Sequence, residues 1–379
     1  MKLVKFSLAA IIALSSSAFG ADSLADAFKE GKVEGKVQAY YWQRDKGVDA
    51  DIMNFGLDLS YETGRFYGFG LKSTFQSSSS PFADKDAKTV FNDDMYGSGS
   101  QLSELYLSYA AGKTTAQVGR MYFATPLIYG SGSRMNKESF EGALITNSDI
   151  PDTKVTLGYV QKMQTRTDGE GNFGKFTKSF DWLNEIEDDA YTIVVENSSL
   201  PNVNLTLAYL DVKDFMEVTY AEASFKKGIF GLASQYYDSK REGYKRTDLF
   251  GLKATLDLGD LSLLAAYTTT GDDYVHAGLG NGADYAFTGS PILSDTYGAN
   301  SDAYKIGVAY KLTPALNVGM NYVLDDRDDK EYSYTSVTTD YTFDAGVFKD
   351  LNVAVLYDDA GRDLDHKELR VNLTFPFSL

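Results

Sequence analysis

The feature that most constrains this chain is an alternation of apolar and polar residues with a period of two, which recurs from residue 33 to the C-terminus. In one segment, Leu316, Val318 and Met320 alternate with Asn317 and Gly319. Successive side chains of an extended strand point to opposite faces, so each segment has one apolar and one polar face. No stretch approaches the roughly 18 uninterrupted apolar residues of a transmembrane helix. The pattern therefore predicts an all-β fold.

Turn residues divide this pattern into segments that are about as long as a bilayer-spanning strand. We predict about eighteen strands, with sixteen also compatible, at residues 33–45, 50–61, 65–76, 101–110, 113–122, 137–147, 153–164, 189–198, 203–211, 214–225, 229–239, 246–257, 261–270, 302–312, 316–325, 331–344, 350–358 and 366–378.

The connections between these segments alternate in length. Tight turns such as 63–64, 111–113 and 259–260 fall at one end, and nearly all the long connections fall at the other end, at 77–100, 123–136, 165–188 and 271–301. Short periplasmic turns opposite long extracellular loops are typical of outer-membrane barrels, and an even strand count places both termini in the periplasm. A soluble sandwich or propeller shares the period of two but does not predict this alternation of connections.

The N-terminus indicates export. Lys2 and Lys5 precede an apolar run from Phe6 to Leu14, and small residues lead to Gly20. A basic start, a short apolar middle and a small-residue end are typical of a cleaved signal peptide. We therefore expect a signal peptide at 1–20, a periplasmic N-terminal segment at 21–32 and a transmembrane barrel at 33–379.

Composition favours a membrane barrel over a soluble exported protein. The chain has 27 tyrosines and 23 phenylalanines, yet its mean hydropathy is −0.27. A barrel reconciles the two values because its rings face lipid or form interfacial girdles while alternate residues face water. The absence of cysteine excludes disulfides and thiolate metal sites, and a net charge of −17 argues against nucleic acid or anionic lipid as a partner. We predict a transmembrane antiparallel β-barrel in the outer membrane of a Gram-negative bacterium.

The last strand carries an apolar face that continues to the final residue. Phe375, Phe377 and Leu379 end this face, and they resemble the signal by which barrel-assembly machinery recognises outer-membrane proteins. Most such signals end in an aromatic residue, whereas this chain ends in leucine.

Three places in the sequence resemble the OprD-type porin family of Gram-negative bacteria. Residues 40–45 read Tyr-Tyr-Trp-Gln-Arg-Asp, like the family's paired tyrosines followed by Arg-Asp. Residues 125–128 and 133–143 resemble its inward-folded third loop and the strand after it, and residues 368–379 resemble its C-terminal end. The resemblance implies eighteen strands and a passive channel for ions and small hydrophilic solutes, amino acids or carboxylates among them.

A barrel of this size encloses more volume than its side chains fill, so we expect a water-filled lumen narrowed by an infolded loop. Charges at the narrowing then determine selectivity. Charged side chains that face lipid at mid-depth cost roughly 2–4 kcal/mol each, so parity assigns most of them to the lumen. The lumenal candidates are Lys36, Arg44, Lys72, Glu104, Lys253, Lys305, Glu368 and Arg370. Arg120 shares the parity of the lipid-facing Val118, so either a bulge intervenes or Arg120 lies at the rim.

The family resemblance also implies the residues of the constriction. The third-loop arginine of the family lies there beside a ladder of lumenal arginines that guides carboxylate-bearing solutes, and the matching residue is Arg134, flanked by Ser133 and followed by Glu141. Arg44 and Arg370 are candidates for the ladder. The alternative is that the lumenal bases only pair with Glu104, Glu141 and Glu368 across the wall.

Acidic pairs recur at the predicted loop end, at 93–94, 188–189, 272–273, 325–326, 328–329 and 358–359. We interpret them mainly as solvated loop charge, with enrichment of cations or divalent bridging to lipopolysaccharide as the alternative. Residues 326–330 lack the third oxygen ligand and the glycine of an EF-hand loop, so we expect no metal site and no cofactor.

Two other functions remain open, an outer-membrane hydrolase and a non-conducting structural or adhesin barrel. The two histidines, His276 and His366, lie in a long loop and at the start of the last strand, without a G-x-S-x-G or H-E-x-x-H motif. The run at 278–282, Gly-Leu-Gly-Asn-Gly, lacks the strand-to-helix setting of a phosphate loop. We therefore predict no enzyme activity. Expected partners are solutes, ions, outer-membrane lipid and lipopolysaccharide, with the chain a monomer or a homotrimer; the preferred ion sign stays open.

Overall fold

The computed structural model describes residues 20–178, 189–284, 286–293, 296–328 and 330–379. All of the expected signal peptide except Gly20 lies outside these residues. The described strands are β1 (Lys32–Asp45), β2 (Asp49–Glu62), β3 (Phe69–Ser79), β4 (Gly99–Ala111), β5 (Thr114–Met121), β6 (Ser139–Asn147), β7 (Thr153–Gln164), β8 (Phe176–Thr177), β9 (Ala190–Asn197), β10 (Val203–Val212), β11 (Met216–Lys227), β12 (Phe230–Arg241), β13 (Thr247–Leu258), β14 (Leu261–Thr270), β15 (Ser301–Lys311), β16 (Leu316–Arg327), β17 (Lys330–Thr342), β18 (Asn352–Arg362) and β19 (His366–Ser378).

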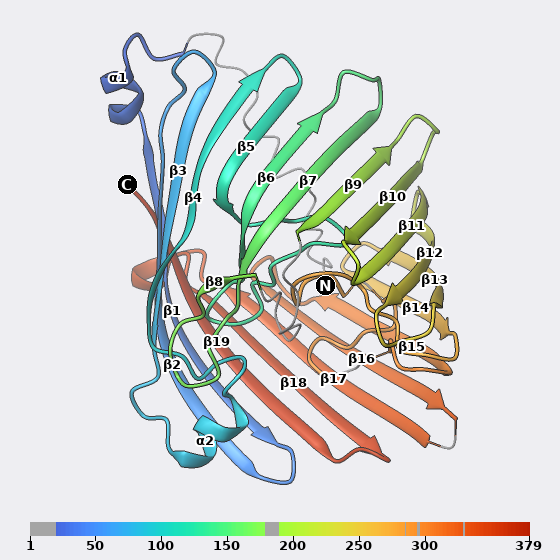
Figure 1. Ribbon diagram of the computed structural model, residues 1–379. Helices are drawn as coiled ribbons and strands as arrows, with labels where there is room; N and C mark the ends of the chain where they lie inside the picture. The colour runs from blue at the N-terminus through green and yellow to red at the C-terminus, as the bar shows by residue number, and fades with distance from the viewer. Residues whose placement is uncertain (1–19, 179–188, 285, 294–295, 329) are drawn as a thin grey trace.

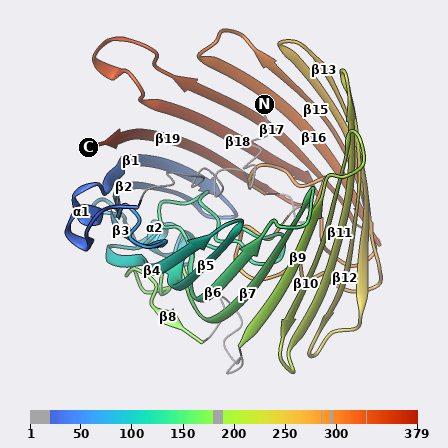
Figure 2. The ribbon, with the colours of Figure 1, turned by 90° about the horizontal axis from the view of Figure 1, so that it is seen from above.

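Among the described residues, eighteen of these strands form one closed antiparallel barrel (Figures 1 and 2). Each strand pairs with the next, β7 pairs with β9, and β19 returns to β1 in a register that runs from Glu34↔Ser378 to Asp45↔Lys367. Closure leaves no unpaired edge, which a bilayer does not tolerate. The prediction of eighteen strands is confirmed, and the two-residue β8 is an addition that lies within a predicted loop.

Strand boundaries agree with the sequence prediction to within about four residues, and one of the two largest differences, at the start of β3, has a local cause. The third strand is expected from residue 65 but begins at Phe69. Tyr67 and Gly68 have φ values of 50° and 85°, so the chain turns here, and Phe66 and Phe69 form an isolated antiparallel bridge. A hydrophobic pattern that continues through a turn cannot reveal this turn.

Three short helical segments accompany the barrel: α1 (Leu24–Lys29), α2 (Lys85–Val90) and a 3₁₀ turn at Gly346–Phe348. The Ser23 side chain caps α1 by accepting a hydrogen bond from the Asp26 N–H. The Ala27 carbonyl accepts a 2.8 Å hydrogen bond from Gly64 N–H, which ties α1 to the β2–β3 turn. Within the described part of the chain, no helix has the length and apolar character needed to cross a membrane.

The two faces of the barrel wall differ as the period of two predicts. Large apolar side chains are exposed on the outer face, for example Val118 at 57%, Leu207 at 59% and Ile306 at 64%. On the inner face of β1, Gln38, Tyr40 and Trp42 are buried under chain segments that fold into the barrel. The outer face is therefore the lipid-facing one, because exposed apolar area of this extent is stabilised by a bilayer and not by water.

The long connections lie at the end of the barrel opposite the C-terminus, and several of them fold into its interior, where they narrow the lumen. We call residues 80–98 loop 2, 122–138 loop 3, 165–189 loop 4 and 271–300 loop 7. Figure 2 shows the segments after β5 and after β14, loops 3 and 7, crossing the inside of the ring of strands. An infolded third loop was predicted; loop 7 was expected to be an ordinary extracellular loop.

Candidate functional site

One side of the narrowing is a backbone seam between loops 3 and 7. Leu279 N–H donates to the Leu127 carbonyl at 2.9 Å, and Tyr129 N–H donates to the Leu279 carbonyl at 3.0 Å. Gly278 has φ +146°, and a Cβ there would lie 2.3 Å from the Leu127 carbonyl oxygen. A Cβ at Gly280 would lie 2.5 Å from the Tyr129 carbonyl oxygen. The glycine run at 278–282 therefore permits two loop backbones to approach each other closely.

Apolar packing fixes this seam to the inner wall of β10–β13. Leu127 of loop 3 and Leu279 of loop 7 belong to one buried cluster. The wall contributes fully buried side chains from successive strands, Leu210, Val218, Tyr237 and Leu249. Full burial of such a side chain contributes about 1.5–3 kcal/mol. This side of the lumen is therefore filled by protein.

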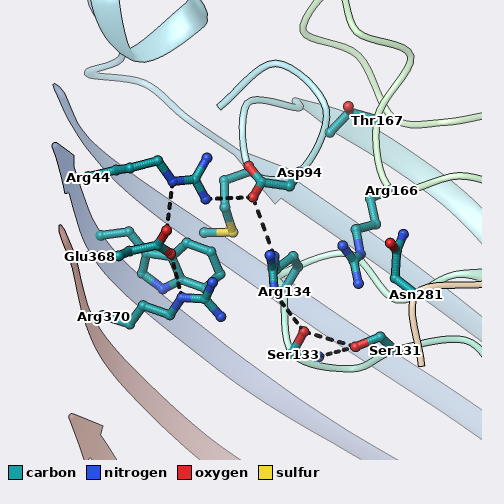
Figure 3. A network of polar contacts seen from close by, with 12 residues as sticks. Arg44, Asp94, Ser131, Ser133, Arg134, Arg166, Thr167, Asn281, Glu368 and Arg370 are labelled. Atoms are coloured by element: carbon teal, nitrogen blue, oxygen red, sulfur yellow. Dashed lines mark hydrogen bonds and ion pairs between the residues drawn. The ribbon is translucent and has the colours of Figure 1, made fainter. Parts of the chain in front are cut away.

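The opposite wall carries a network of arginines and carboxylates (Figure 3). Arg44 of β1 donates from Nε to Glu368 at 2.7 Å and from Nη2 to Asp94 of loop 2 at 2.8 Å. Arg370 of β19 donates from Nε to the other oxygen of Glu368 at 2.6 Å. Arg370 and Glu368 are only 2% and 1% exposed. Loop 2 and the ring of Trp42 cover this pair. These two residues hold the network in place from the wall.

Arg134 extends the network from loop 3 toward the centre of the barrel. Its Nε lies 3.4 Å from Asp94 Oδ2, and its Nη1 donates to Ser133 Oγ at 2.9 Å. The guanidinium groups of Arg134 and Arg370 lie 5.1 Å and 3.9 Å from the ring centre of Trp42. Burial and the neighbouring Arg370 and Arg166 lower the pKa of Arg134, but an arginine keeps its proton at neutral pH. Arg134 is thus a fixed positive charge at the narrowing.

A buried carboxylate, Glu138, joins the two sides. It is 0% exposed and accepts hydrogen bonds from Ser131 N–H at 3.1 Å and Asn281 N–H at 2.9 Å, and from the Asn281 side chain. Arg166 of loop 4 lies 3.7 Å from the same carboxylate. Loops 3, 4 and 7 therefore meet at one buried carboxyl group, which fixes their relative positions.

Three lysines continue the positive charge into the lumen beyond loop 3. Lys36 of β1 lies 3.0 Å from Asp58, and Lys72 of β3 lies 3.4 Å from Glu104. Lys137 of loop 3 lies 4.0 Å from the ring centre of Tyr122, and burial lowers its pKa to about 8. Side-chain exposures of 37% for Lys36 and 28% for Lys72 show that both reach lumenal water.

The remaining lumenal candidates, Lys253 and Lys305, hold loop 7. Lys253 Nζ lies 3.8 Å from the ring centre of Phe287, and Lys305 Nζ donates to the Gly289 carbonyl. Asp358 completes the attachment by accepting hydrogen bonds from Ser290 Oγ at 2.7 Å and from the N–H groups of residues 292 and 293 at 3.0 Å. These lysines therefore contact a loop.

Several of the acidic pairs are not the solvated charge that the sequence suggests. Asp94 bonds Arg44, Asp358 anchors loop 7, and Asp325 is 0% exposed and accepts from Ser301 Oγ at 2.5 Å. The interpretation as solvated charge is wrong for these three residues because each satisfies buried donors that the sequence does not reveal. Asp188 and Asp329 lie outside the described residues. Within those residues, no group of His, Asp and Glu side chains is arranged to hold a metal ion.

Glu141 lies away from the narrowing that the resemblance implies for it. It follows the outward parity of Ile145 on β6 and pairs across the strands with Arg120, whose Nε lies 3.2 Å from Glu141 Oε2. Arg120 also faces outward, since the registers of β5 with both neighbours run through it without a shift. The neighbouring register shifts lie between other strand pairs, between β6 and β7 after Glu141 and between β3 and β4 after Thr74. Arg120 therefore lies near the outer rim, as one of the two alternatives proposed.

The two histidines are placed apart from one another. His276 of loop 7 lies between the rings of Tyr244 and Tyr274, with centroid distances of 4.7 Å and 5.0 Å, and burial lowers its pKa to about 4. His366 lies 3.9 Å from Glu368 in the arginine network. A neutral histidine enclosed by tyrosine rings has the surroundings of a packing residue.

Asp94, Glu138, Arg166 and Asp284 belong to the site but were not singled out as its residues from the sequence. Asp284 of loop 7 faces lumenal water, and the electrostatic influence of Arg134 and Arg166 reaches it. The surrounding protein nevertheless raises its pKa to about 6. Asp94, Arg166 and Asp284 lie in loops that carry no periodic pattern, and Glu138 lies in loop 3 although the predicted strand at 137–147 included it. Only their acidic or basic character could have drawn attention to them as site residues.

The family model described as outer membrane porin, OprD family, matches residues 29–379. No curated protein matches the chain. Among solved structures, Acinetobacter baumannii OccAB1 superposes with a TM-score of 0.80 at 18% identity, over 95% of this chain and 99% of that one. Pseudomonas aeruginosa OccK3 (OpdO) gives 0.76 at 17% identity, over 94% and 98% of the two chains. Pseudomonas aeruginosa OpdK with vanillate gives 0.79 at 14% identity, over 93% and 100%.

The family match covers the whole barrel, and the solved structures share its fold. Porins of this family are channels for small solutes, and a barrel narrowed by charged loops fits that role, in contrast to a hydrolase or an adhesin. The chain belongs to the OprD family of outer membrane porins and is a channel for small solutes in the outer membrane of a Gram-negative bacterium.

Proposed function

We propose that the channel selects small hydrophilic solutes that carry a carboxylate, including amino acids, and guides them along the cationic wall. The observation that carries this proposal is the position of Arg134. Asp94 and Ser133 hold its guanidinium where loops 2 and 3 meet the inner wall, while the seam of loops 3 and 7 occupies the other side. A solute that passes the narrowing must therefore pass a fixed positive charge.

The charge of the network supports a preference for carboxylates over cations. Four arginines, Arg44, Arg134, Arg166 and Arg370, contact three carboxylates, those of Asp94, Glu138 and Glu368, which leaves one positive charge in excess. Lys36, Lys72 and Lys137, set against the carboxylates of Asp58 and Glu104, add one further positive charge beyond loop 3. A low-dielectric wall focuses such a potential and raises the local concentration of anions.

Asp284 adds a negative charge on the loop 7 side of the narrowing. Above its pKa of about 6 it is ionised, so the narrowing has cations from β1, β19 and loop 3 on one side and a carboxylate on the other. Opposed charges create a transverse field that orients a zwitterion. This supports amino acids as solutes together with simple carboxylates.

The solved OpdK structure supports the same solute class, since its bound vanillate carries a carboxylate.

Passage along fixed charges requires no catalytic group, so we propose that the chain is not an enzyme. We further propose that residues 1–20 are removed on export, that residues 21–32 lie in the periplasm, and that Phe375, Phe377 and Leu379 are recognised by barrel-assembly machinery. Phe375 and Leu379 are 41% and 87% exposed, and Phe377 is partly buried. We propose a monomer or a homotrimer.

Arg134→Ala tests the proposed role of the constriction. In planar bilayers under a salt gradient, we expect the reversal potential to shift toward cation preference, and the permeability ratio of acetate to potassium to fall about three- to tenfold. Arg134→Lys should keep most of the preference because it keeps the charge. Arg246→Ala is the matched control, since this arginine lies at the rim with its side chain 56% exposed. An unchanged reversal potential and acetate permeability in Arg134→Ala would contradict the proposal.

A further inference from the structure

The outer face of the wall formed by β5, β6 and β7 carries three charged side chains near its loop end. Arg120, Glu141 and Lys162, which we call the outer trio, are aligned across these strands by the registers Arg120↔Glu141 and Glu141↔Lys162. Val118 and Ile145, on the same face, are 57% and 45% exposed. The outer trio therefore faces away from the lumen and has no part in conduction.

The contacts within the outer trio leave one positive charge uncompensated. Glu141 bridges Arg120 at 3.2 Å and Lys162 at 2.9 Å, so a single carboxylate is shared by two cations. The Arg120 guanidinium also lies 4.3 Å from the ring centre of Phe176 of β8, which Figure 2 shows at the periphery of the molecule beyond β4–β7. Both cationic side chains remain about one-third exposed, at 35% and 36%.

The depth of the outer trio places it at the level of lipid headgroups. Toward the middle of the wall, Tyr159 and Tyr191 form a ring pair with centroids 5.4 Å apart, and the aliphatic Leu157 follows on the same face. Tyrosines of a barrel mark the boundary between hydrocarbon and headgroups. The outer trio lies beyond this boundary on the side of the extracellular loops, so it faces the headgroups of the outer leaflet.

We propose that the outer trio binds a phosphate group of lipid A, the phosphorylated glycolipid of the outer leaflet, through Arg120 and Lys162. Within the described residues, Arg120 uses only Nε for a hydrogen bond, which leaves its terminal nitrogens available to phosphate oxygens. A guanidinium fork beside an ammonium group fits a phosphate, and Phe176 fixes the plane of the fork. The site is separate from the proposed solute path.

Another sector of the same rim lacks the excess positive charge of the outer trio. At β11–β13, Arg246 lies 2.7 Å from Asp238 and 3.9 Å from Glu217, so two carboxylates surround one cation. This sector carries an excess negative charge and should repel a phosphate. Arg246 is therefore a matched control, an arginine at the same end of the barrel with the opposite local balance.

The test measures lipid A binding to the delipidated, detergent-solubilised full barrel by native mass spectrometry. The probes are diphosphorylated lipid A, its dephosphorylated form, phosphatidylglycerol and inorganic phosphate. We expect Arg120→Gln/Lys162→Gln to weaken lipid A binding about tenfold, since two charge-assisted contacts are lost. Glu141→Gln should strengthen binding because it removes the competing carboxylate, a gain that a purely structural role would not produce. Arg246→Gln should leave binding unchanged.

Single-channel conductance of each variant shows whether the barrel has folded. Equal binding of lipid A to the double variant, or equal binding of the dephosphorylated form to the native chain, would overturn the proposal. Equal affinity for phosphatidylglycerol would overturn the choice of lipid A, and phosphate that binds as tightly as the lipid would do the same. If the double variant instead lost a homo-oligomer without losing lipid, another copy of the chain would be the occupant and the proposal would be wrong.

Discussion

The two sides of the narrowing are built from different interactions. On the side of β10–β13, loops 3 and 7 pair through their backbones and pack apolar side chains such as Leu127 and Leu279 against the wall. On the side of β1 and β19, Arg44, Arg134 and Arg370 share carboxylates. An apolar cluster that includes Met95 of loop 2 and Met135 of loop 3 packs on the same side. The comparison teaches that apolar packing positions loops on both sides, while only the second side also supplies the arginine charge that solutes meet.

Glu138 links the two sides, so its removal should have the largest effect. Glu138→Ala leaves the buried Arg166 without its carboxylate and removes the acceptor of Ser131 and Asn281. Breaking a buried pair from one side costs about 3–5 kcal/mol. We expect loops 3 and 7 to separate, with larger and more variable single-channel conductance and a lower midpoint of unfolding in urea. Glu331→Ala, at a carboxylate that is 58% exposed, should change neither quantity. A Glu138→Ala channel with native conductance would show that the two sides are independent.

The seam alone is tested by Gly278→Ala. The added Cβ would meet the Leu127 carbonyl oxygen at 2.3 Å in a backbone of φ +146°, and such strain costs about 1–3 kcal/mol. We expect conductance to rise because loop 7 moves off loop 3, while the ion preference set by the opposite wall persists. Gly243→Ala is the control, since Gly243 also has a positive φ of +81° but has no atom within 4 Å of its Cβ position. If both variants changed conductance alike, backbone strain alone and not the loop contact would be the cause.

The same comparison explains how much of the protein could be predicted from its sequence. Alternation and turns predicted eighteen strands and both termini at one end, because the period of two can be read within each strand without knowledge of its neighbours. The arginine side was partly foreseen, since Arg44 and Arg370 lie on strands with a readable parity and the third loop resembles a known family. Glu138 and Gly278 were not foreseen, because their roles depend on a contact between two loops more than a hundred residues apart in the chain. Glu141 was misplaced because adjacency to loop 3 in sequence does not determine the face of β6.

A change of pH should separate the contribution of loop 7 to ion preference from the contribution of the arginine side. Asp284 has a pKa raised to about 6, chiefly by its protein surroundings, so it is mostly neutral at pH 5 and ionised at pH 7. Loss of this negative charge at low pH leaves the arginines unopposed. We therefore expect anion preference, measured as reversal potential, to increase as the pH falls through 6. Asp284→Asn should show the low-pH preference at both pH values. A native channel whose preference is constant from pH 5 to pH 7 would place Asp284 outside the solute path.

A substitution at the rim should have the smallest effect on ion preference, because the rim belongs to neither side of the narrowing. Lys245 and Asp272 form a 3.1 Å pair, and their side chains are 72% and 64% exposed. This pair is more exposed than the seam and the arginine network, and among the described residues it shares no contact partner with them. Salt screens such charges within about 8–10 Å at 0.1–0.15 M. Asp272→Asn should therefore leave reversal potential unchanged at 0.15 M and shift it slightly toward anions only at about 0.01 M salt, where the Debye length is about 30 Å. A shift of equal size at both salt concentrations would mean that the rim is part of the narrowing, because only charges enclosed by protein escape screening.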